Sequence, residues 1–169
     1  GGISIYGAIL FGIGALFIYH KIKNFLILKY LDILALTMPL CQSIGRWGNF
    51  FNQEAYGAPY SGFLKMYISE NCRYSQLKDI EYYHPAFLYE SILDFLLFLI
   101  LLTVFLKFKN IKTGTITCLY LFLYALIRIF VENIRLDSVL NISNIPIATI
   151  ISIILMSLAL TALFFIYKK

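Results

Sequence analysis

Apolar residues along the chain are grouped into long runs that are separated by short polar segments. Five runs approach the roughly 17–25 residues that a helix needs to cross a bilayer. They lie at approximately 3–19, 25–44, 86–106, 115–131 and 145–167. Lys29, Asp32 and Pro39 interrupt the second run, but membrane helices tolerate a proline whose freed carbonyl is satisfied by neighbours. The pattern therefore predicts an all-α polytopic transmembrane helix bundle with about five spans.

The composition supports a membrane location. Of 169 residues, 60% are hydrophobic and 14% are charged, and the mean hydropathy is +0.80. A soluble domain of this length could not bury so much apolar surface in one core. The net charge of +5 would suit nucleic-acid binding in a soluble protein, but here the basic residues form short clusters between apolar runs. Such clusters are typical of topology-setting loops, so we expect membrane lipids and no nucleic acid as partners.

Lysines and arginines are expected on opposite sides of the membrane. Lysines follow the first, third and fifth runs at 21–23, 107–112 and 168–169, and five alternating spans place these clusters on one side. The positive-inside rule makes this side, and the C-terminus, cytoplasmic. The outer side then holds segments of about 46–84 and 132–144, and all four arginines lie at or near it. Because the guanidinium group suits phosphate and carboxylate, we expect a functional site there.

The chain is expected to form one membrane domain, 1–169, within a longer protein. No internal repeat, low-complexity tract or linker divides it. It opens on Gly1 and Gly2, without an initiating Met or a signal peptide, at the edge of an apolar run. The three cysteines have no metal-ligand spacing, and Cys41 and Cys118 are expected to be packing residues in or beside the apolar runs.

The strongest candidate site residue is Arg128, which apolar residues flank inside the fourth run. Tyr124, Arg128, Glu132 and Arg135 are spaced by four, four and three residues, so they lie on one stripe of a helix. An arginine within an apolar span typically faces the protein interior or an aqueous cavity, and it is a candidate functional residue. We expect Glu132 to hold Arg128 by a salt bridge.

A second polar segment, 45–57, follows the second run and has the sequence GRWGNFFNQEAYG. Arg46 is expected at headgroup depth, with Asn49 and Glu54 just beyond it, and the glycines, including Gly57, are expected to permit tight turns. One interpretation is a helix end that aromatic residues and a snorkelling arginine anchor at the interface. The other is a binding site, which the density of hydrogen-bonding groups beside apolar spans favours.

A third polar segment, 84–90, opens the third run with the sequence HPAFLYE. Glu90 lies about one turn into the apolar region, and Asp94 follows four residues later on the same face. Two carboxylates at this depth are costly unless they are paired or face a wet cavity. They therefore either neutralise arginines structurally or have a direct role. His84 is either a base or a structural histidine at the interface.

These polar stretches resemble those of the prolipoprotein diacylglyceryl transferase family. Segment 45–57 is similar to the family signature almost residue for residue, 84–90 resembles its HP-x-x-LYE element, and 124–135 resembles its Y-x-x-x-R-x-x-x-E-x-x-R helix. The resemblance implies a bundle of seven helices, of which the first two are missing here, with an outside N-terminus. It also implies a bacterial cytoplasmic membrane, with the active site toward the outer leaflet.

The resemblance further implies a transferase of lipoprotein biosynthesis. Such an enzyme moves the diacylglyceryl group of phosphatidylglycerol to the lipobox cysteine in a prolipoprotein signal peptide. A thioether forms and glycerol phosphate leaves. The reaction is expected to need no metal or other cofactor. Arg46 and Arg128 are then expected to be catalytic, because preorganised cations stabilise charge that grows on the departing phosphate. The expected substrate-binding residues are Arg46, Asn49, Glu54, Gly57, Tyr124, Glu132 and Arg135, with His84, Tyr89 and Glu90 in possible support.

The third residue expected to be catalytic, Tyr6, marks a departure from the family, which usually has a histidine in this position. That histidine has been considered a general base, whereas a phenol with a pKa near ~10 is a poor base at neutral pH. Three interpretations follow: the position hydrogen-bonds lipid, which we favour; the protein uses another base; or its activity is low. Taken alone, Tyr6 would be an aromatic-belt tyrosine at the outer end of its span.

Two alternatives come from other classes of protein. A transporter or channel could use the Arg128–Glu132 pair in a permeation path, which predicts access from both sides and often a repeated architecture. A non-catalytic relative could bind lipid or protein partners with the same pair. The lack of a repeat and the gathering of polar residues on one side favour the enzyme.

Overall fold

The computed structural model describes residues 5–23, 26–136, 141–142 and 145–168. It is built almost entirely from long helices, with short strands in the connections. The helices are α1 (Ile5–Lys23), α2 (Ile27–Asn52), α3 (Ala86–Lys107), α4 (Thr115–Glu132) and α5 (Ile147–Lys168). The antiparallel strand pairs are β1 (Met66–Tyr67) with β2 (Tyr82–Tyr83), and β3 (Asn141–Ile142) with β4 (Ile145–Pro146).

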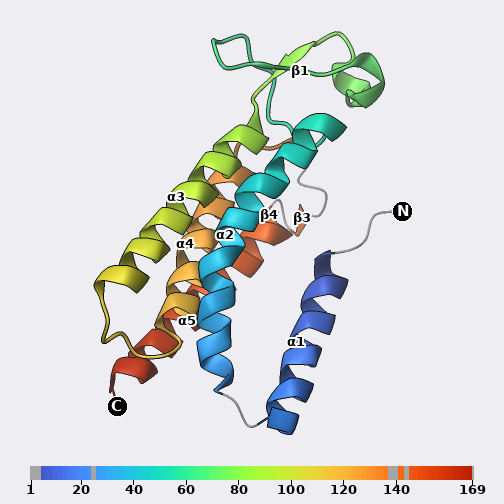
Figure 1. The fold of residues 1–169 in the computed structure, drawn as a ribbon. Helices are drawn as coiled ribbons and strands as arrows, with labels where there is room; N and C mark the ends of the chain where they lie inside the picture. The colour runs from blue at the N-terminus through green and yellow to red at the C-terminus, as the bar shows by residue number, and fades with distance from the viewer. Residues whose placement is uncertain (1–4, 24–25, 137–140, 143–144, 169) are drawn as a thin grey trace.

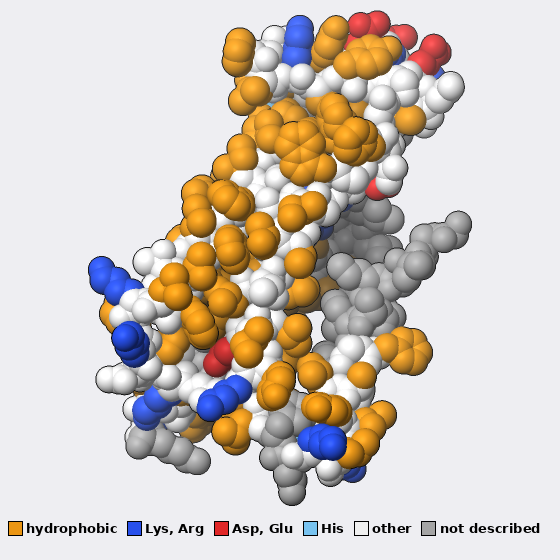
Figure 2. All heavy atoms as spheres, in the orientation of Figure 1, with side chains coloured by type: hydrophobic (Ala, Val, Ile, Leu, Met, Phe, Trp, Pro, Cys, Tyr) orange, Lys and Arg blue, Asp and Glu red, His pale blue; other side chains and the backbone are white. Residues whose placement is uncertain are grey.

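Helices α2 to α5 run alternately up and down and pack side by side, while α1 stands beside the first turns of α2 (Figure 1). Within the described residues, α2, α3, α4 and α5 are each long and apolar enough to cross a membrane. Hydrophobic side chains cover the flanks of these helices, as Figure 2 shows, and that is the surface expected of helices in contact with lipid. The predicted all-α polytopic fold is therefore confirmed, and the first of the five spans stays a prediction.

Helix α2 continues further than its hydrophobic run predicted. The run ends near residue 44, but the helix reaches Asn52, so Gly45 and Gly48 lie inside a helix and make no turn. The chain turns instead at Gln53 and Ala55, whose φ angles of 51° and 56° lie in the left-handed region. The expectation that these two glycines permit turns was therefore wrong, and residues 46–52 belong to the helix rather than to an outer loop.

The segment between α2 and α3 forms a small subdomain above the bundle (Figure 1), which we call the outer subdomain because it lies outside the helix bundle. The pair β1–β2 and two short 3₁₀ helices, Glu70–Cys72 and Ser75–Leu77, make up its frame. Its buried residues are Tyr56, Met66, Ile68, Tyr83 and Phe87. The Tyr56 hydroxyl donates to the Cys72 carbonyl at 2.9 Å and accepts from the Tyr74 backbone N–H at 3.2 Å. Burial raises the pKa of Tyr56 to about 12.

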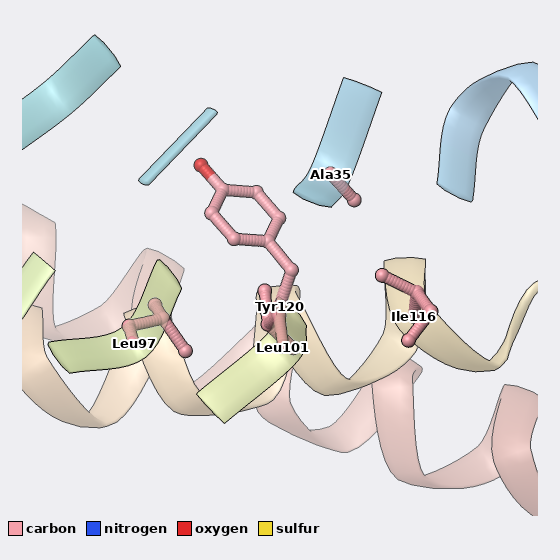
Figure 3. Packing of buried hydrophobic residues seen from close by; sticks show 5 residues of the cluster. All are labelled: Ala35, Leu97, Leu101, Ile116 and Tyr120. Atoms are coloured by element: carbon pink, nitrogen blue, oxygen red, sulfur yellow. The ribbon is translucent and has the colours of Figure 1, made fainter. Parts of the chain in front are cut away.

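The interior of the bundle is an apolar cluster between α2, α3 and α4. Its buried residues are Ala35, Leu97, Leu101, Ile116 and Tyr120. In Figure 3 the Tyr120 ring extends from α4 toward α2, and its hydroxyl donates to Gln42 Oε1 of α2 at 3.2 Å. This cluster packs α2, α3 and α4 against one another.

The two ends of the bundle carry different charges. Lysines lie at the end formed by the start of α2, the α3–α4 loop and the end of α5, which we call the lysine end; it is the lower end in Figures 1 and 2. The arginines lie at the opposite end, which we call the arginine end, together with Lys65 and Lys78 of the outer subdomain. At the lysine end the Asp32 carboxylate of α2 accepts from the Gly114 N–H at 2.6 Å and from the Thr117 N–H at 2.9 Å, which caps the start of α4.

Candidate functional site

Three helices bring polar groups together at the arginine end. Arg46 is in α2, Glu90 is in the second turn of α3, and Arg128 is near the end of α4. Directly below them, Ser43 of α2 and Ser91 of α3 form reciprocal hydrogen bonds of 2.8 Å, each hydroxyl to the other residue's carbonyl. These buried bonds fix α2 against α3, and so they set the distance between Arg46 and Glu90.

Glu90 is the centre of the group. Its carboxylate forms a salt bridge with Arg46 of α2. Arg128 Nη1 lies 3.7 Å from Oε1 of the same carboxylate, and Arg135 Nη1, just beyond α4, lies 4.0 Å from Oε2. Arg128 also forms a 2.8 Å salt bridge to Glu132, as the spacing of the stripe predicted. We call Arg46, Glu90, Arg128, Glu132 and Arg135 the arginine cluster.

The arginine cluster is partly buried and carries an excess of positive charge. The Glu90 side chain is 2% exposed, whereas those of Arg46 and Arg128 are each 22% exposed. Its three guanidinium groups outnumber its two carboxylates, so these five residues together have a formal charge of +1. Guanidinium groups that are held in place and partly open can accept a further anion with little reorganisation.

Asp94 lies one turn deeper than Glu90 on the same face of α3, as the sequence predicted. Its side chain is fully buried, and neither carboxylate oxygen has a hydrogen-bond partner among the described residues. The two carboxylates therefore differ: Glu90 neutralises arginines, whereas Asp94 forms no ion pair in the described part of the chain. A buried polar group without partners is costly, and this makes Asp94 the least satisfied side chain near the arginine cluster.

Asn49 and Glu54 form a separate polar group at the end of α2. Glu54 Oε1 accepts hydrogen bonds of 3.1 Å from the side-chain amides of both Asn49 and Asn52. The Glu54 backbone N–H also donates to the Asn49 carbonyl at 3.0 Å. Two of the residues expected to bind substrate are thus joined to each other, in the turn that follows Arg46.

Gly57 allows three segments of backbone to meet. Its N–H donates to the His84 carbonyl at 2.9 Å, and it pairs with Arg135 in an antiparallel bridge. A Cβ atom at this position would lie 2.8 Å from His84 Cβ and 2.9 Å from the Ile134 carbonyl oxygen. The absence of a side chain therefore lets the chain that carries Arg135 approach the outer subdomain, which is a structural reason for glycine here.

His84 and Tyr89 form a pair beside the arginine cluster. His84 Nδ1 lies 3.1 Å from the Tyr89 hydroxyl, and its ring stacks on Tyr60 with 3.8 Å between ring centroids. Tyr124 lies on the same stripe of α4 as Arg128 and is half-buried. Its ring stacks on that of Tyr120, with 5.7 Å between the ring centroids. The side chain of Tyr6 lies outside the described residues, so its predicted role is left open.

Arg73 is the arginine that does not join the cluster. Its Nε donates to the Ile68 carbonyl at 2.9 Å, and its Nη1 donates to the Lys78 carbonyl at 2.6 Å. The arginine therefore braces the outer subdomain. The predicted crowding of arginines at one end divides into a group of three around Glu90 and one structural arginine.

Comparison with known proteins identifies the family of the chain. The family model described as prolipoprotein diacylglyceryl transferase matches residues 1–166. The chain belongs to this family. Its relatives include phosphatidylglycerol–prolipoprotein diacylglyceryl transferases. The one from Thermotoga petrophila is 42% identical over a match that covers 95% of this chain and 55% of the relative. The one from Gloeobacter violaceus is 44% identical over a match that covers 83% of this chain and 52% of the relative. The relative from Synechocystis is 41% identical over 99% of this chain and 60% of its own length.

The chain thus spans about half the length of the curated relatives it matches. Family membership and the apolar helices together identify an integral membrane protein. In this member of the prolipoprotein diacylglyceryl transferase family, sequence reasoning placed Glu90 only among possible supporting residues, although the structure places it at the centre of the arginines. The available signal was its position one turn into an apolar span, where an unpaired carboxylate would be costly.

Proposed function

We propose that the protein transfers the diacylglyceryl group of phosphatidylglycerol to the thiol of a lipobox cysteine in a prolipoprotein signal peptide. The observation that carries this proposal is the arginine cluster, in which three partly exposed guanidinium groups surround one buried carboxylate. A phosphodiester carries one negative charge, which matches the formal charge of +1 on the five residues of the cluster. The names of the relatives give the two substrates.

The reaction exchanges one bond for another. The cysteine thiolate attacks the lipid glyceryl carbon that is bonded to the phosphate oxygen, so a C–S bond forms and that C–O bond breaks. The leaving group is glycerol phosphate, and the proton lost by the thiol balances the additional charge on it. No electrons are transferred to an external acceptor, and only the lipid and the peptide are consumed.

Arg46 and Arg128 would accelerate this step by electrostatic stabilisation. Negative charge grows on the phosphate as the C–O bond breaks, and cations that are already in place stabilise it without reorganisation. One donor of this kind typically contributes roughly 3–4 kcal/mol to lowering a barrier. A cation also lowers the pKa of a nearby thiol from its usual ~8.5, so Arg128 would help to form the thiolate. Glu132 and Glu90 would hold the two guanidinium groups in position.

The arginine end would face the outside of the bacterial cytoplasmic membrane, and the C-terminus would face the cytoplasm. The lysines at the opposite end support this orientation, because lysine-rich loops remain on the cytoplasmic side. The phosphate of an outer-leaflet phospholipid would then lie at the depth of Arg46. The signal peptide of the prolipoprotein would approach within the membrane with its cysteine at the same depth.

The experiment that tests this proposal follows both products. Purified protein is given phosphatidylglycerol labelled in its headgroup and a peptide that contains a lipobox cysteine. We expect the peptide to gain the mass of one diacylglyceryl group while an equal amount of labelled glycerol phosphate is released. A peptide with serine in place of the cysteine is the matched control, and it should give neither product.

Two results would contradict the proposal. One is the absence of any thioether, with the protein folded as judged by its helical circular dichroism. The other is release of glycerol phosphate at the same rate with the serine peptide, which would indicate lipid hydrolysis rather than transfer to the thiol.

A further inference from the structure

A cavity with charged residues in its lining lies at the lysine end, away from the arginine cluster. It is a cavity of about 380 Å³ between the start of α2, the end of α3 and the loop that leads into α4. Lysine side chains and apolar side chains both line it. Those that matter for its chemistry are Lys29, Lys109, Lys112, Ile33, Phe105 and Ile116.

Two of these lysines are available to a ligand. Lys112 is already engaged, because its Nζ donates to the Ile166 carbonyl at 2.9 Å at the end of α5. Lys29 and Lys109 are exposed, and within the described part of the chain neither forms an ion pair or a hydrogen bond through its ammonium group. Two ammonium groups on one small cavity create a local site of positive charge.

The acidic residue that lines the same cavity does not cancel this charge. The Asp32 carboxylate accepts three hydrogen bonds, from the Gly114 N–H, the Thr117 N–H and the Thr117 hydroxyl. It therefore neutralises the positive end of the α4 helix dipole, and both of its oxygens are engaged. Asp32 is also 8% exposed, so it is withdrawn from the mouth of the cavity.

We propose that this cavity binds the headgroup of an anionic phospholipid from the leaflet at the lysine end. Basic pockets between transmembrane helices at the membrane surface are suited to anionic lipid headgroups. Lys29 and Lys109 would contact the phosphate, and Ile33, Phe105 and Ile116 would lie along the upper part of the acyl chains. The apolar lining favours a lipid over a soluble anion, which would gain nothing from it.

This site would be separate from the proposed active site. Lys29 and Arg46 lie in the same helix α2, 17 residues apart, which corresponds to roughly 25 Å along the helix axis. A lipid at the lysine end would therefore occupy the opposite leaflet from a lipid at the arginine cluster. The inference does not depend on the proposed transferase reaction.

A tryptophan reporter tests this inference. Trp47 is the only tryptophan in the chain, so Trp47→Phe combined with Phe108→Trp moves the emission to the α3–α4 loop beside the cavity. The reporter protein is placed in vesicles that contain either dibrominated phosphatidylserine or dibrominated phosphatidylcholine, both of which quench a neighbouring tryptophan. We expect phosphatidylserine to associate at least several-fold more strongly than phosphatidylcholine.

Removal of the two free lysines should abolish that preference. A lysine near an anionic surface contributes roughly a five-fold change in association, so Lys29→Gln with Lys109→Gln should weaken phosphatidylserine binding on the order of ten-fold or more. The matched control is Lys21→Gln with Lys23→Gln, which removes the same charge at the same end but outside the cavity. The single change Lys109→Gln, in an exposed loop, should give an intermediate effect if the double variant folds poorly.

Three results would overturn the inference. One is equal quenching by the two lipids in the reporter protein. The second is an equal loss of the preference in the cavity variants and in the control variant, which would indicate a diffuse attraction. The third is recovery of the emission on adding inorganic phosphate at constant ionic strength, which would assign the cavity to a soluble anion.

Discussion

At the scale of single residues, the arrangement depends most on Glu90. Three guanidinium groups from two helices and the chain beyond α4 lie around its buried carboxylate. Without this negative charge, the three cations would repel one another in a site that is only partly open to solvent. Glu90 is therefore a structural counter-ion for the groups that we propose act on the lipid phosphate.

We expect Glu90→Gln to destabilise the protein strongly. Removal of one partner from a buried ion pair typically costs about 3–5 kcal/mol, because the remaining charge stays buried. Thermal unfolding in detergent, followed by circular dichroism, measures the loss. The matched control is Glu54→Gln, since Glu54 is exposed and bonds only neutral side-chain amides, and it should change stability by less than about 1 kcal/mol. Equal effects of the two changes would contradict the assigned role of Glu90.

Gly57 offers a second test at this scale. A methyl group at Gly57 would meet His84 Cβ at 2.8 Å and backbone oxygen at 2.9 Å, so Gly57→Ala forces the subdomain away from the chain that carries Arg135. We expect a destabilisation of roughly 1–3 kcal/mol in the same unfolding measurement. Gly48→Ala is the control, because Gly48 lies in a helix with no heavy atom within 4 Å of its Cβ position, and it should be neutral or stabilising. An unaffected Gly57→Ala variant would show that the close approach is dispensable.

The salt bridges of single residues show which contacts the sequence could predict and which it could not. The Arg128–Glu132 salt bridge follows from a spacing of four residues in one helix, and it was foreseen. The contacts of Glu90 with Arg46 and Arg135 join α3 to α2 and to the chain after α4, and these depend on how the helices pack. No local pattern contains that information.

At the scale of helices and segments, hydrophobic runs located the four described spans to within a few residues, except at the end of α2. Residues 45–52 are rich in glycine and polar groups, which predicts a loop, yet they continue the helix. Trp47 and Phe50 pack on Phe87 of α3, with ring centroids 5.6 and 5.1 Å apart. This tertiary packing outweighs the weak helix propensity of the glycines.

The start of α4 gives a testable feature at this scale. Asp32 of α2 satisfies the first backbone N–H groups of α4, so one side chain fixes the relation of two helices. We expect Asp32→Ala to lower stability by about 1–2 kcal/mol through the loss of this cap. Thr117→Val is the control, because it removes only the hydroxyl donor, and its effect should be smaller. If thermal unfolding shows equal stability for Asp32→Ala and the unchanged protein, the cap does not contribute.

The outer subdomain should lose stability at high pH. Burial raises the pKa of Tyr56 to about 12 from the ordinary value of 10.0, so the folded state retains the phenol proton that the unfolded state releases. The contribution is fully present below pH ~10 and is lost as the pH rises from about 10 toward 12. Chemical denaturation at a series of alkaline pH values measures this loss, and Tyr56→Phe should reduce its slope. An identical slope in the variant would assign the loss to other groups.

At the scale of the whole molecule, charge and hydropathy predicted more than any single motif. Five alternating runs placed the lysine clusters at one end and the arginines at the other, and the described helices have this arrangement. The outer subdomain was not predictable in the same way. Its core of five residues and its pair of two-residue strands rest on contacts between positions up to 31 residues apart, without a repeating pattern.

The proposed activity of the molecule depends on the arginine cluster, which we propose stabilises negative charge on the departing phosphate. Replacement of arginine by lysine is the sharpest change, because it keeps the positive charge and removes the planar pair of donors. The most direct measurement is kcat for thioether formation by Arg128→Lys, with Arg73→Lys as the matched control. Arg73 braces the outer subdomain through two backbone carbonyls and lies outside the cluster.

We expect kcat to fall by about 100-fold or more in Arg128→Lys, as is typical when one transition-state donor is lost. The Arg73→Lys variant should stay within about three-fold of the unchanged protein, and both variants should retain their helical circular dichroism. Retention of nearly full kcat by Arg128→Lys, or an equal loss in Arg73→Lys, would contradict the central role of the arginine cluster.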